Sequence, residues 1–177
     1  DTFSVTVEDL CSRTTETSEF DHVIVGSGHF SVPHVPQFEG IETFPGSLQH
    51  AHDFRGAEGF ADKNVLLIGA SYSAEDIGAQ SYKMGAKSVT FSYRTAPMGF
   101  NWPNGMEELP LVERFDGSTV HFSNGVAREF DAVVLCTGYL HHYPFLPSDL
   151  ALNSPNCLYP DGLYRGVGSE ADNKLFY

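Results

Sequence analysis

One short segment of the chain has residue types and spacing suited to holding a phosphate group. Residues 69–74 read Gly-Ala-Ser-Tyr-Ser-Ala and directly follow the apolar run 65–68. A glycine first in such a segment permits a sharp turn after a strand, and a small last residue lets the following helix lie close to that strand. Backbone N–H groups at the start of the helix would then meet a diphosphate at the positive end of the helix dipole. The candidate nucleotide-binding residues of this turn are Gly69, Ser71, Tyr72, Ser73 and Ala74.

The turn departs from the G-x-G-x-x-G/A pattern at its second glycine. Ser71 stands there, which narrows the approach of a pyrophosphate to the backbone but adds a hydroxyl donor. Glu75 and Asp76 suit the first turn of a helix electrostatically, yet they would repel a diphosphate unless they turn away from it. An ordinary strand-to-helix turn is the alternative interpretation, and the surrounding β-α-β pattern favours nucleotide binding.

The end of the next strand suggests which nucleotide is bound. An NAD-specific unit places a carboxylate there for the ribose hydroxyls, but this chain has Tyr93-Arg94-Thr95. Arg94 could form a charge-assisted pair with a 2′-phosphate, and Thr95 could add a hydroxyl contact. We therefore expect NADPH rather than NADH, with a solvated strand-end cation as the alternative for Arg94.

These residues need an α/β scaffold to position them. The run 65–68 is typical of a parallel strand covered on both faces, a helix is expected from about Ser73 to Met84, and 88–93 is the next strand. Further on, Asn124-Gly125 predicts a hairpin between 119–122 and 126–129, and 132–136 is another buried strand. The predicted fold is a Rossmann-like, three-layer NAD(P)-binding domain with a β-meander, plus flanking pieces of a second, FAD-binding domain.

A sequence pattern that occurs twice supports two nested dinucleotide domains. Segments 20–29 and 130–139 share the pattern F-D-x-V-[IV]-[VL]-x-[ST]-G-[HY], and each follows a meander-like stretch. Pro33 and Pro36 forbid a helix after the first copy, so its Gly-x-Gly is not a phosphate-binding loop. The second copy contains three further candidate cofactor-binding residues, Cys136, Thr137 and Gly138.

The segment 44–54 carries a more specific signal. It matches F-x-G-x-x-x-H-x-x-x-F, and the chain thereby resembles flavin-containing monooxygenases and the related Baeyer–Villiger enzymes. Together with 69–74, 93–99 and 135–139, the resemblance extends over essentially the whole chain. Within the family the chain is most similar to the bacterial branch that N-oxygenates small amines such as trimethylamine, across 48–54, 71–78 and 139–145.

The resemblance implies a flavin-dependent monooxygenase that uses FAD and NADPH. NADPH would reduce FAD, molecular oxygen would react with the reduced flavin, and one oxygen atom would pass to a small amine or sulfide substrate. Tyr72 and Ser73 would lie beside the bound nicotinamide nucleotide, NADP⁺ would stay in place to shield the flavin from water, and His50 would link domains. No catalytic residue and no metal ligand is assigned within this chain.

The resemblance also predicts how the chain is divided. We expect 1–40 to end the first FAD-domain segment, 41–61 to be an inter-domain linker, 62–139 to bind NADPH, and 140–177 to return into the FAD domain. The family's FAD fingerprint, a substrate-pocket asparagine and a carboxyl-terminal stretch are missing. The isolated chain is therefore expected to be inactive and to have exposed apolar surface and poor solubility.

Composition excludes several partners. The 177 residues carry 10 Lys+Arg against 23 Asp+Glu, a net charge of −13 that would repel nucleic acid and anionic lipid. The chain has no run of about 18 apolar residues, so no membrane span is expected and a cytoplasmic protein fits best.

The cysteines form no C-x-x-C, and the pairs His50/His52 and His141/His142 are interpreted as loop histidines rather than metal ligands. The three cysteines are Cys11, Cys136 and Cys157.

Two other functions remain open. A flavin disulfide reductase-like protein that uses NAD(P)H shares the paired dinucleotide folds, but it needs a redox dithiol that these cysteines do not supply. A non-catalytic dinucleotide-binding module is the second alternative. The sequence leaves the identity of the amine or sulfide open, and it leaves open whether the full-length protein is a homodimer.

Overall fold

The computed structural model describes residues 2–152 and 160–177, so Cys157 and part of the range 140–177 lie outside the described residues. The chain forms two compact units. Unit 1 consists of 1–32 and 139–177, and unit 2 consists of 33–138. Within the described part of the chain, no helix is long and apolar enough to cross a membrane.

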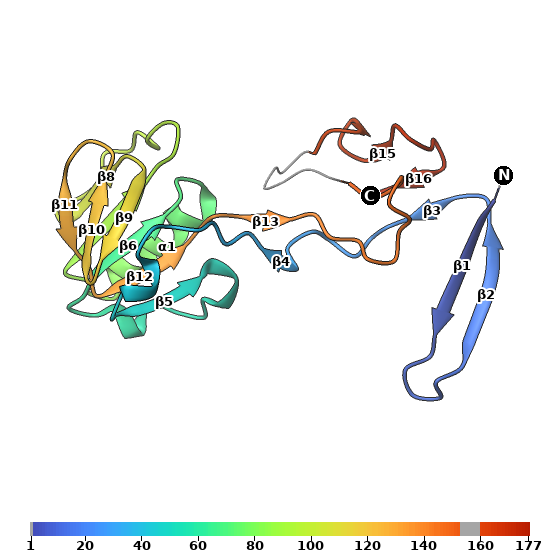
Figure 1. Cartoon of the computed structure of the whole chain (residues 1–177), viewed down its shortest axis with the longest axis horizontal. Coiled ribbons are helices and arrows are strands. Elements are labelled where there is room, and N and C mark those ends of the chain that lie inside the picture. The colour runs from blue at the N-terminus through green and yellow to red at the C-terminus, as the bar shows by residue number, and fades with distance from the viewer. Residues whose placement is uncertain (1, 153–159) are drawn as a thin grey trace. The chain divides into compact units, whose positions relative to one another are not determined.

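Unit 2 is built around a five-stranded sheet in which every strand pair is parallel (Figure 1). In spatial order the strands are β5 (Ser47–His50), β12 (Ala132–Leu135), β6 (Asn64–Ile68), β7 (Ser88–Ser92) and β8 (Met106–Leu109). The predicted strands at 65–68, 88–93 and 132–136 are thus confirmed as neighbours in one sheet.

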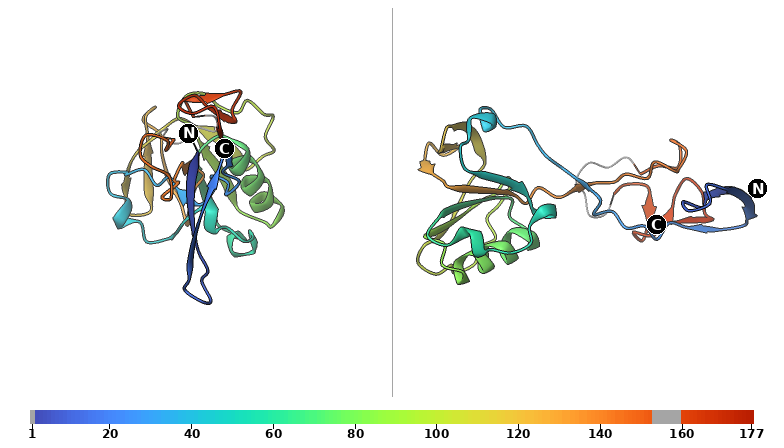
Figure 2. Two further views of the ribbon diagram at one scale, coloured as in Figure 1. Left: turned by 90° about the vertical axis from the view of Figure 1, so that its right-hand side faces the viewer. Right: turned by 90° about the horizontal axis from the view of Figure 1, so that it is seen from below.

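Both faces of this sheet are covered. Along β6, Val65 and Leu67 join the core beneath helix α1 (Tyr72–Lys83), while Leu66 and Ile68 join the core on the opposite face. The opposite face is covered by an antiparallel meander made of β9 (Val112–Asp116), β10 (Thr119–Phe122) and β11 (Ala127–Glu129). Figure 2 allows the helix and the meander to be followed on the two sides of the sheet. The unit has the predicted three-layer, Rossmann-like α/β fold.

Local sequence explains where α1 ends. The helix begins one residue earlier than expected, at Tyr72, and ends at Lys83. Gly85 has a φ of 86°, its N–H donates to the Tyr82 carbonyl at 3.1 Å, and the N–H of Ala86 donates to the Ser81 carbonyl at 3.0 Å. This pair of hydrogen bonds satisfies the last carbonyls of the helix, and it depends on a glycine that tolerates the left-handed conformation.

The Asn-Gly hairpin is also confirmed. β10 and β11 pair antiparallel, and Gly125 between them has a φ of 79°. The side-chain oxygen of Asn124 accepts a hydrogen bond from the N–H of Val126 at 3.1 Å, which closes the turn.

The range 41–61, expected as a linker, lies inside unit 2 and supplies its edge strand. β5 pairs along its whole length with β12, and Gly46 precedes it where a side chain would not fit, since an added Cβ would lie 2.3 Å from the Asp131 carbonyl oxygen. The unit boundaries fall at 32/33 and 138/139, the second within one residue of the expected boundary after 139. Three short 3₁₀ helices complete this part of unit 2: Ile41–Thr43, Ala51–Asp53 and Glu58–Phe60.

Unit 1 contains short strands around a small core. Its strands are β1 (Phe3–Glu8), β2 (Thr15–Phe20), β3 (Val23–Ile24), β13 (Tyr139–Leu140), β14 (Leu163–Tyr164), β15 (Gly168–Ser169) and β16 (Leu175–Phe176). β3 pairs in parallel with β16, and the core contains the buried Val25, Tyr143, Leu152 and Leu175. β13 pairs with β4 (Val32–Pro33), and the boundary between the units falls between the two residues of β4.

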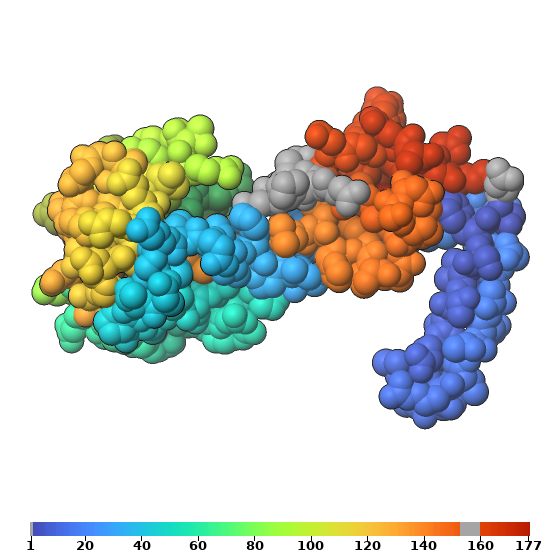
Figure 3. Space-filling view, viewed as in Figure 1, coloured from blue at the N-terminus to red at the C-terminus, as the bar shows by residue number. Residues whose placement is uncertain are grey.

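The first two strands form a hairpin. Most of the polar stretch 12–19 lies in β2, which pairs with β1 from Phe3↔Phe20 to Glu8↔Thr15. Nearly all side chains of β2 are exposed. Val7 in β1 and Leu10 in the turn are 61% and 74% exposed. In the space-filling view no other described segment of unit 1 covers the visible face of the hairpin (Figure 3). The expected exposed apolar surface is therefore present in unit 1.

We expect Gly78→Ala to destabilise unit 2. An added Cβ would lie 2.4 Å from the ring of Phe91 and 3.0 Å from Leu67 Cδ1, in the packed layer between α1 and the sheet. Overpacking of about 1–3 kcal/mol should outweigh the gain of about 1 kcal/mol in helix propensity. The measurement is urea unfolding followed by the fluorescence of Trp102, the single tryptophan, whose ring stacks on Phe91.

Gly59→Ala is the matched control for this substitution. Gly59 is exposed and nothing lies within 4 Å of a Cβ added there, so a change of less than about 0.5 kcal/mol is expected. Equal urea midpoints for Gly78→Ala and Gly59→Ala would contradict the close packing of Gly78 against Phe91.

Candidate functional site

The strand order of unit 2 creates a topological switch point. From β6 the chain continues to β7 and β8 on one side, and then returns through the meander to β12 on the other side of β6. Ligands of open α/β sheets bind outside the carboxyl ends of the strands that flank such a point. Residues 69–71 follow β6 there and residues 136–138 follow β12, so the structure brings the two predicted segments together (Figure 1).

Gly69 is required at this point by a close backbone approach. Its φ is 135°, and an added Cβ would lie 2.2 Å from the carbonyl oxygen of Cys136. The N–H of Gly69 donates to the Ser92 carbonyl at 2.9 Å, and the N–H of Cys136 donates to the Ile68 carbonyl at 2.8 Å. The exits of β6, β7 and β12 are therefore held to one another by backbone hydrogen bonds.

The start of α1 has no side-chain cap. Ser71 is the N-cap residue in an extended conformation, and its side chain makes no capping hydrogen bond. Backbone N–H groups in the first turn of a helix have no partner within the helix. Ala74 is completely buried against the sheet, as the motif requires, whereas Tyr72 is 83% exposed and Ser73 is exposed as well.

An acidic residue near this helix start is turned along the helix. The carboxylate of Asp76 accepts a hydrogen bond from the side-chain amide of Gln80 at 3.0 Å, one helical turn further on. This contact draws its charge toward the body of α1 and away from the Ser71 cap. The repulsion of a diphosphate expected from the sequence is thereby reduced for Asp76.

Arg94 and Thr95 follow the end of β7 and are both exposed. Among residues 2–152 and 160–177, no ion pair involves Arg94. A guanidinium group without a carboxylate partner keeps its donors available for an anion such as a phosphate.

The exit of β12 is tied to the segment that enters unit 2. The hydroxyl of Thr137 donates to the carbonyl of His34, and the N–H of His34 donates to the Gly138 carbonyl at 2.9 Å. The hydroxyl of Thr137 is therefore used within the chain, which leaves its backbone N–H as the group available to a ligand.

The side chain of Cys136 belongs to the core rather than to a reactive site. It lies under α1 and is 9% exposed. Burial raises the pKa of its thiol to about 12, so the thiol is protonated at neutral pH.

His50 also lies at this edge of the sheet, although sequence reasoning did not include it in the site. It ends β5 beside Leu135, is 5% exposed, and its Nδ1 accepts a hydrogen bond from the N–H of His52 at 3.0 Å. Burial lowers the pKa of His50, and a backbone hydrogen bond with Gly138 opposes that shift. The histidine of the 44–54 motif could have indicated this position, because it is the motif residue at the carboxyl end of β5.

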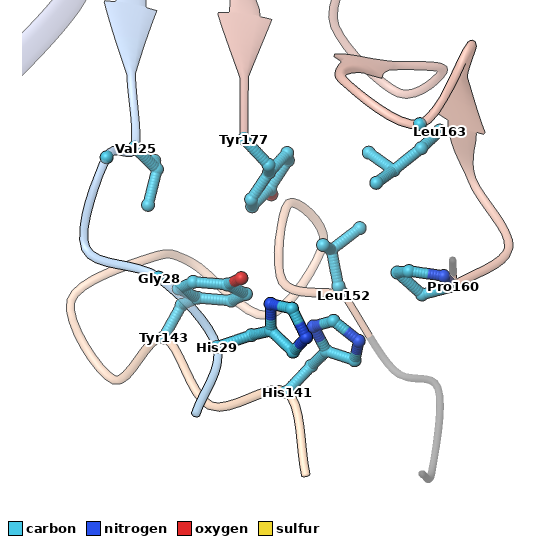
Figure 4. Close-up of a pocket in the computed structure, with 11 residues that line it drawn as sticks. Val25, Gly28, His29, His141, Tyr143, Leu152, Pro160, Leu163 and Tyr177 are labelled. Atoms are coloured by element: carbon cyan, nitrogen blue, oxygen red, sulfur yellow. The ribbon is translucent and has the colours of Figure 1, made fainter. Parts of the chain in front are cut away.

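Unit 1 has a pocket of about 400 Å³ of its own. Gly26 and Gly28 are among its lining residues, and the rings of His29 and His141, which also line it, stack at 5.0 Å between centroids (Figure 4). Burial lowers the pKa of His29, and the neighbouring charge of His141 lowers it further. β4 rather than a helix follows the glycines, which confirms that 26–31 is not a strand-to-helix phosphate loop.

The described residues include no group of three or more His, Cys, Asp or Glu side chains that could hold a metal ion.

Several known proteins are similar to this chain. A family model described as flavin-binding monooxygenase-like matches residues 4–102. The chain is 56% identical over all 177 residues to trimethylamine monooxygenase of Roseovarius sp. (strain 217), and 54% identical over 175 residues to that of Methylocella silvestris. It covers 40% and 39% of those two proteins, so it spans about two fifths of the length of these relatives.

A solved structure gives the same result. The crystal structure of Tmm from Pelagibacter sp. strain HTCC7211 superimposes with a TM-score of 0.88 at 48% identity, covering 100% of this chain and 40% of that one. The family model matches more than half of the sequence, and the glycine turn of this chain stands at the switch point. The chain therefore belongs to the flavin-binding monooxygenase-like family.

Proposed function

We propose that this chain is the NADPH-binding portion of an FAD- and NADPH-dependent monooxygenase that N-oxygenates small amines such as trimethylamine. The observation that carries the proposal is the 56% identity, along the entire chain, to a trimethylamine monooxygenase. Because the chain spans 40% of that relative, the activity is proposed for the whole protein, with the amine or a sulfide and molecular oxygen as substrates.

The residues of unit 2 fit a dinucleotide phosphate. The turn at Gly69 and the uncapped start of α1 offer backbone N–H groups to the diphosphate, in the manner of other dinucleotide-binding helices. Arg94 and Thr95, at the end of β7, would hold the 2′-phosphate that distinguishes NADPH from NADH. The exit of β12 would contribute backbone contacts from residues 136–138.

The bound cofactors would supply hydride transfer and the activation of oxygen. The part of this chain is to bind and orient them and to keep water away. Tyr72, which is exposed beside the helix start, is suited to cover the nicotinamide end of the nucleotide. The pocket of unit 1 combines glycine backbone with stacked rings, which suits a planar ligand and supports a contribution of unit 1 to flavin binding.

A disulfide reductase is less well supported. Such an enzyme needs a thiolate near the flavin, but the Cys136 thiol is buried and its pKa is raised to about 12. Cys11 is exposed in the β1–β2 hairpin of unit 1.

We expect Arg94→Ala to weaken NADPH binding by about 10- to 100-fold and to leave NADH binding within about twofold. The physical reason is the loss of a charge-assisted hydrogen bond to the 2′-phosphate, worth about 1.5–3 kcal/mol. Calorimetric titration of the chain with each nucleotide measures the effect. Arg114→Ala, which removes an exposed charge from β9, is the control and should change neither affinity. An unchanged NADPH affinity in Arg94→Ala would refute the 2′-phosphate assignment.

The reaction is tested on the flavin-loaded, full-length protein. Trimethylamine should stimulate NADPH oxidation and yield its N-oxide, because a tertiary amine is a soft nucleophile that accepts an oxygen atom. Product analysis by mass spectrometry identifies the N-oxide. Reduction of a disulfide substrate without any N-oxide would favour the reductase alternative, and nucleotide binding without either reaction would favour a non-catalytic module.

Thiol reactivity provides an independent test of the reductase alternative. In a Cys11→Ser/Cys157→Ser variant the remaining Cys136 should react with a disulfide reagent at pH 8 far more slowly in native protein than in urea. With a pKa of about 12, roughly one thiol in ten thousand is ionised at that pH. Rapid labelling of the native variant would contradict the burial of Cys136.

A further inference from the structure

The loop that carries Arg94 is anchored at both ends to consecutive residues of β8. At its start, the N–H of Tyr93 donates to the Leu109 carbonyl at 2.9 Å. At its far end, the N–H groups of Met98 and Gly99 donate to the Glu108 carboxylate, at 2.6 Å to Oε2 and 3.1 Å to Oε1. The exposed residues 94–97 lie between these two anchors.

A third donor reaches the same carboxylate. The indole N–H of Trp102 donates to Glu108 Oε1 at 2.8 Å, and the indole ring stacks on Phe91 with centroids 4.6 Å apart. Phe91 is the neighbour of Glu108 across the β7–β8 pair and belongs to the core beneath α1. The sheet therefore fixes the position of Glu108, and Glu108 in turn fixes the loop.

Such anchoring has a direct consequence for anion binding. A cation on a mobile loop must lose conformational freedom when it closes on a phosphate, whereas a cation on a preorganised loop binds without that cost. The three N–H donors also bind the Glu108 oxygens. The negative charge of Glu108 is therefore stabilised by the loop backbone and the indole. An alanine at 108 would leave the N–H groups of Met98 and Gly99 without their acceptor.

We infer that Glu108 is a positioning residue for 2′-phosphate recognition: by holding the backbone of residues 98–99, it keeps Arg94 and Thr95 where a dinucleotide bound at the Gly69 turn presents its adenosine ribose. This inference rests on the proposed role of Arg94. Glu108 does not touch the nucleotide in this account, and its whole effect passes through the loop.

Glu108→Ala should reduce NADPH affinity by about five- to tenfold and leave NADH affinity unchanged, as expected for a coupled neighbour of the binding residue. In an Arg94→Ala background the same substitution should have no further effect. Calorimetric titration of the full chain with NADPH and NADH, for the two single variants and the double variant, measures this coupling. Glu107→Gln, which changes a neighbouring acid paired with Arg128 at 3.4 Å, is the control and should keep the wild-type preference.

A second readout does not depend on nucleotide binding. Amide hydrogen exchange at Met98 and Gly99 should accelerate in Glu108→Ala and be partly restored in Glu108→Gln, since glutamine keeps one carbonyl acceptor. Trp102→Phe removes the indole donor but keeps a ring against Phe91. Trp102→Phe should therefore cause a smaller loss of NADPH preference than Glu108→Ala. It also tests the inference if Glu108→Ala does not fold.

The outcomes separate this inference from the proposed function. If Arg94→Ala lowers the NADPH preference but Glu108→Ala does not, the inference is overturned and the function stands. An equal loss of NADPH and NADH affinity, or an effect of Glu108→Ala that persists without Arg94, would also overturn it. If Arg94→Ala leaves the preference unchanged, the 2′-phosphate assignment fails and the inference fails with it, whatever the exchange rates.

Discussion

The close approach of two strand exits is the constraint on which the rest of unit 2 depends. The backbone at Gly69 lies so near the Cys136 carbonyl that no side chain fits between them. This contact joins β6 to β12 at the switch point and allows α1 to begin at Tyr72, directly outside the sheet. The first N–H groups of the helix lack partners within the helix. The proposed dinucleotide site therefore rests on backbone geometry before any charged side chain is considered.

Charge plays a local role in this acidic chain. With a net charge of −13, the average field would repel a phosphate, yet charges further away than about 10 Å are largely screened at physiological ionic strength. Near the candidate site, the relevant features are the helix start, the guanidinium of Arg94, which makes no ion pair with the described residues, and the Asp76 carboxylate, which accepts a hydrogen bond from Gln80. Glu108 is the most closely engaged acid, and its oxygens accept three N–H donors of the neighbouring loop.

The two units differ in how much of their apolar surface is covered. Unit 2 has packed cores on both faces of its sheet, so the candidate nucleotide site stands on a complete scaffold. Unit 1 has a small core and leaves apolar side chains such as Val7 and Ile24 exposed. The repeated sequence pattern occurs once with a strand of each unit, β3 and β12. Each of these strands follows antiparallel strands, pairs in parallel with another strand, and is followed by a segment that contains glycine.

The sequence alone determined the strand–turn–helix–strand unit around Gly69, the Asn-Gly hairpin and the exit of β12, because continuous apolar runs and glycine turns act over a few residues. Tertiary structure decided the rest. β5 and β2 have polar sequences without strand periodicity, and they are strands because their backbones pair with distant or neighbouring partners. The hydroxyl of Thr137 binds His34, 103 residues away in the chain, and Glu108 reaches across to the loop after β7. No local pattern encodes such pairings, since they exist only after the sheet has brought the strand ends together.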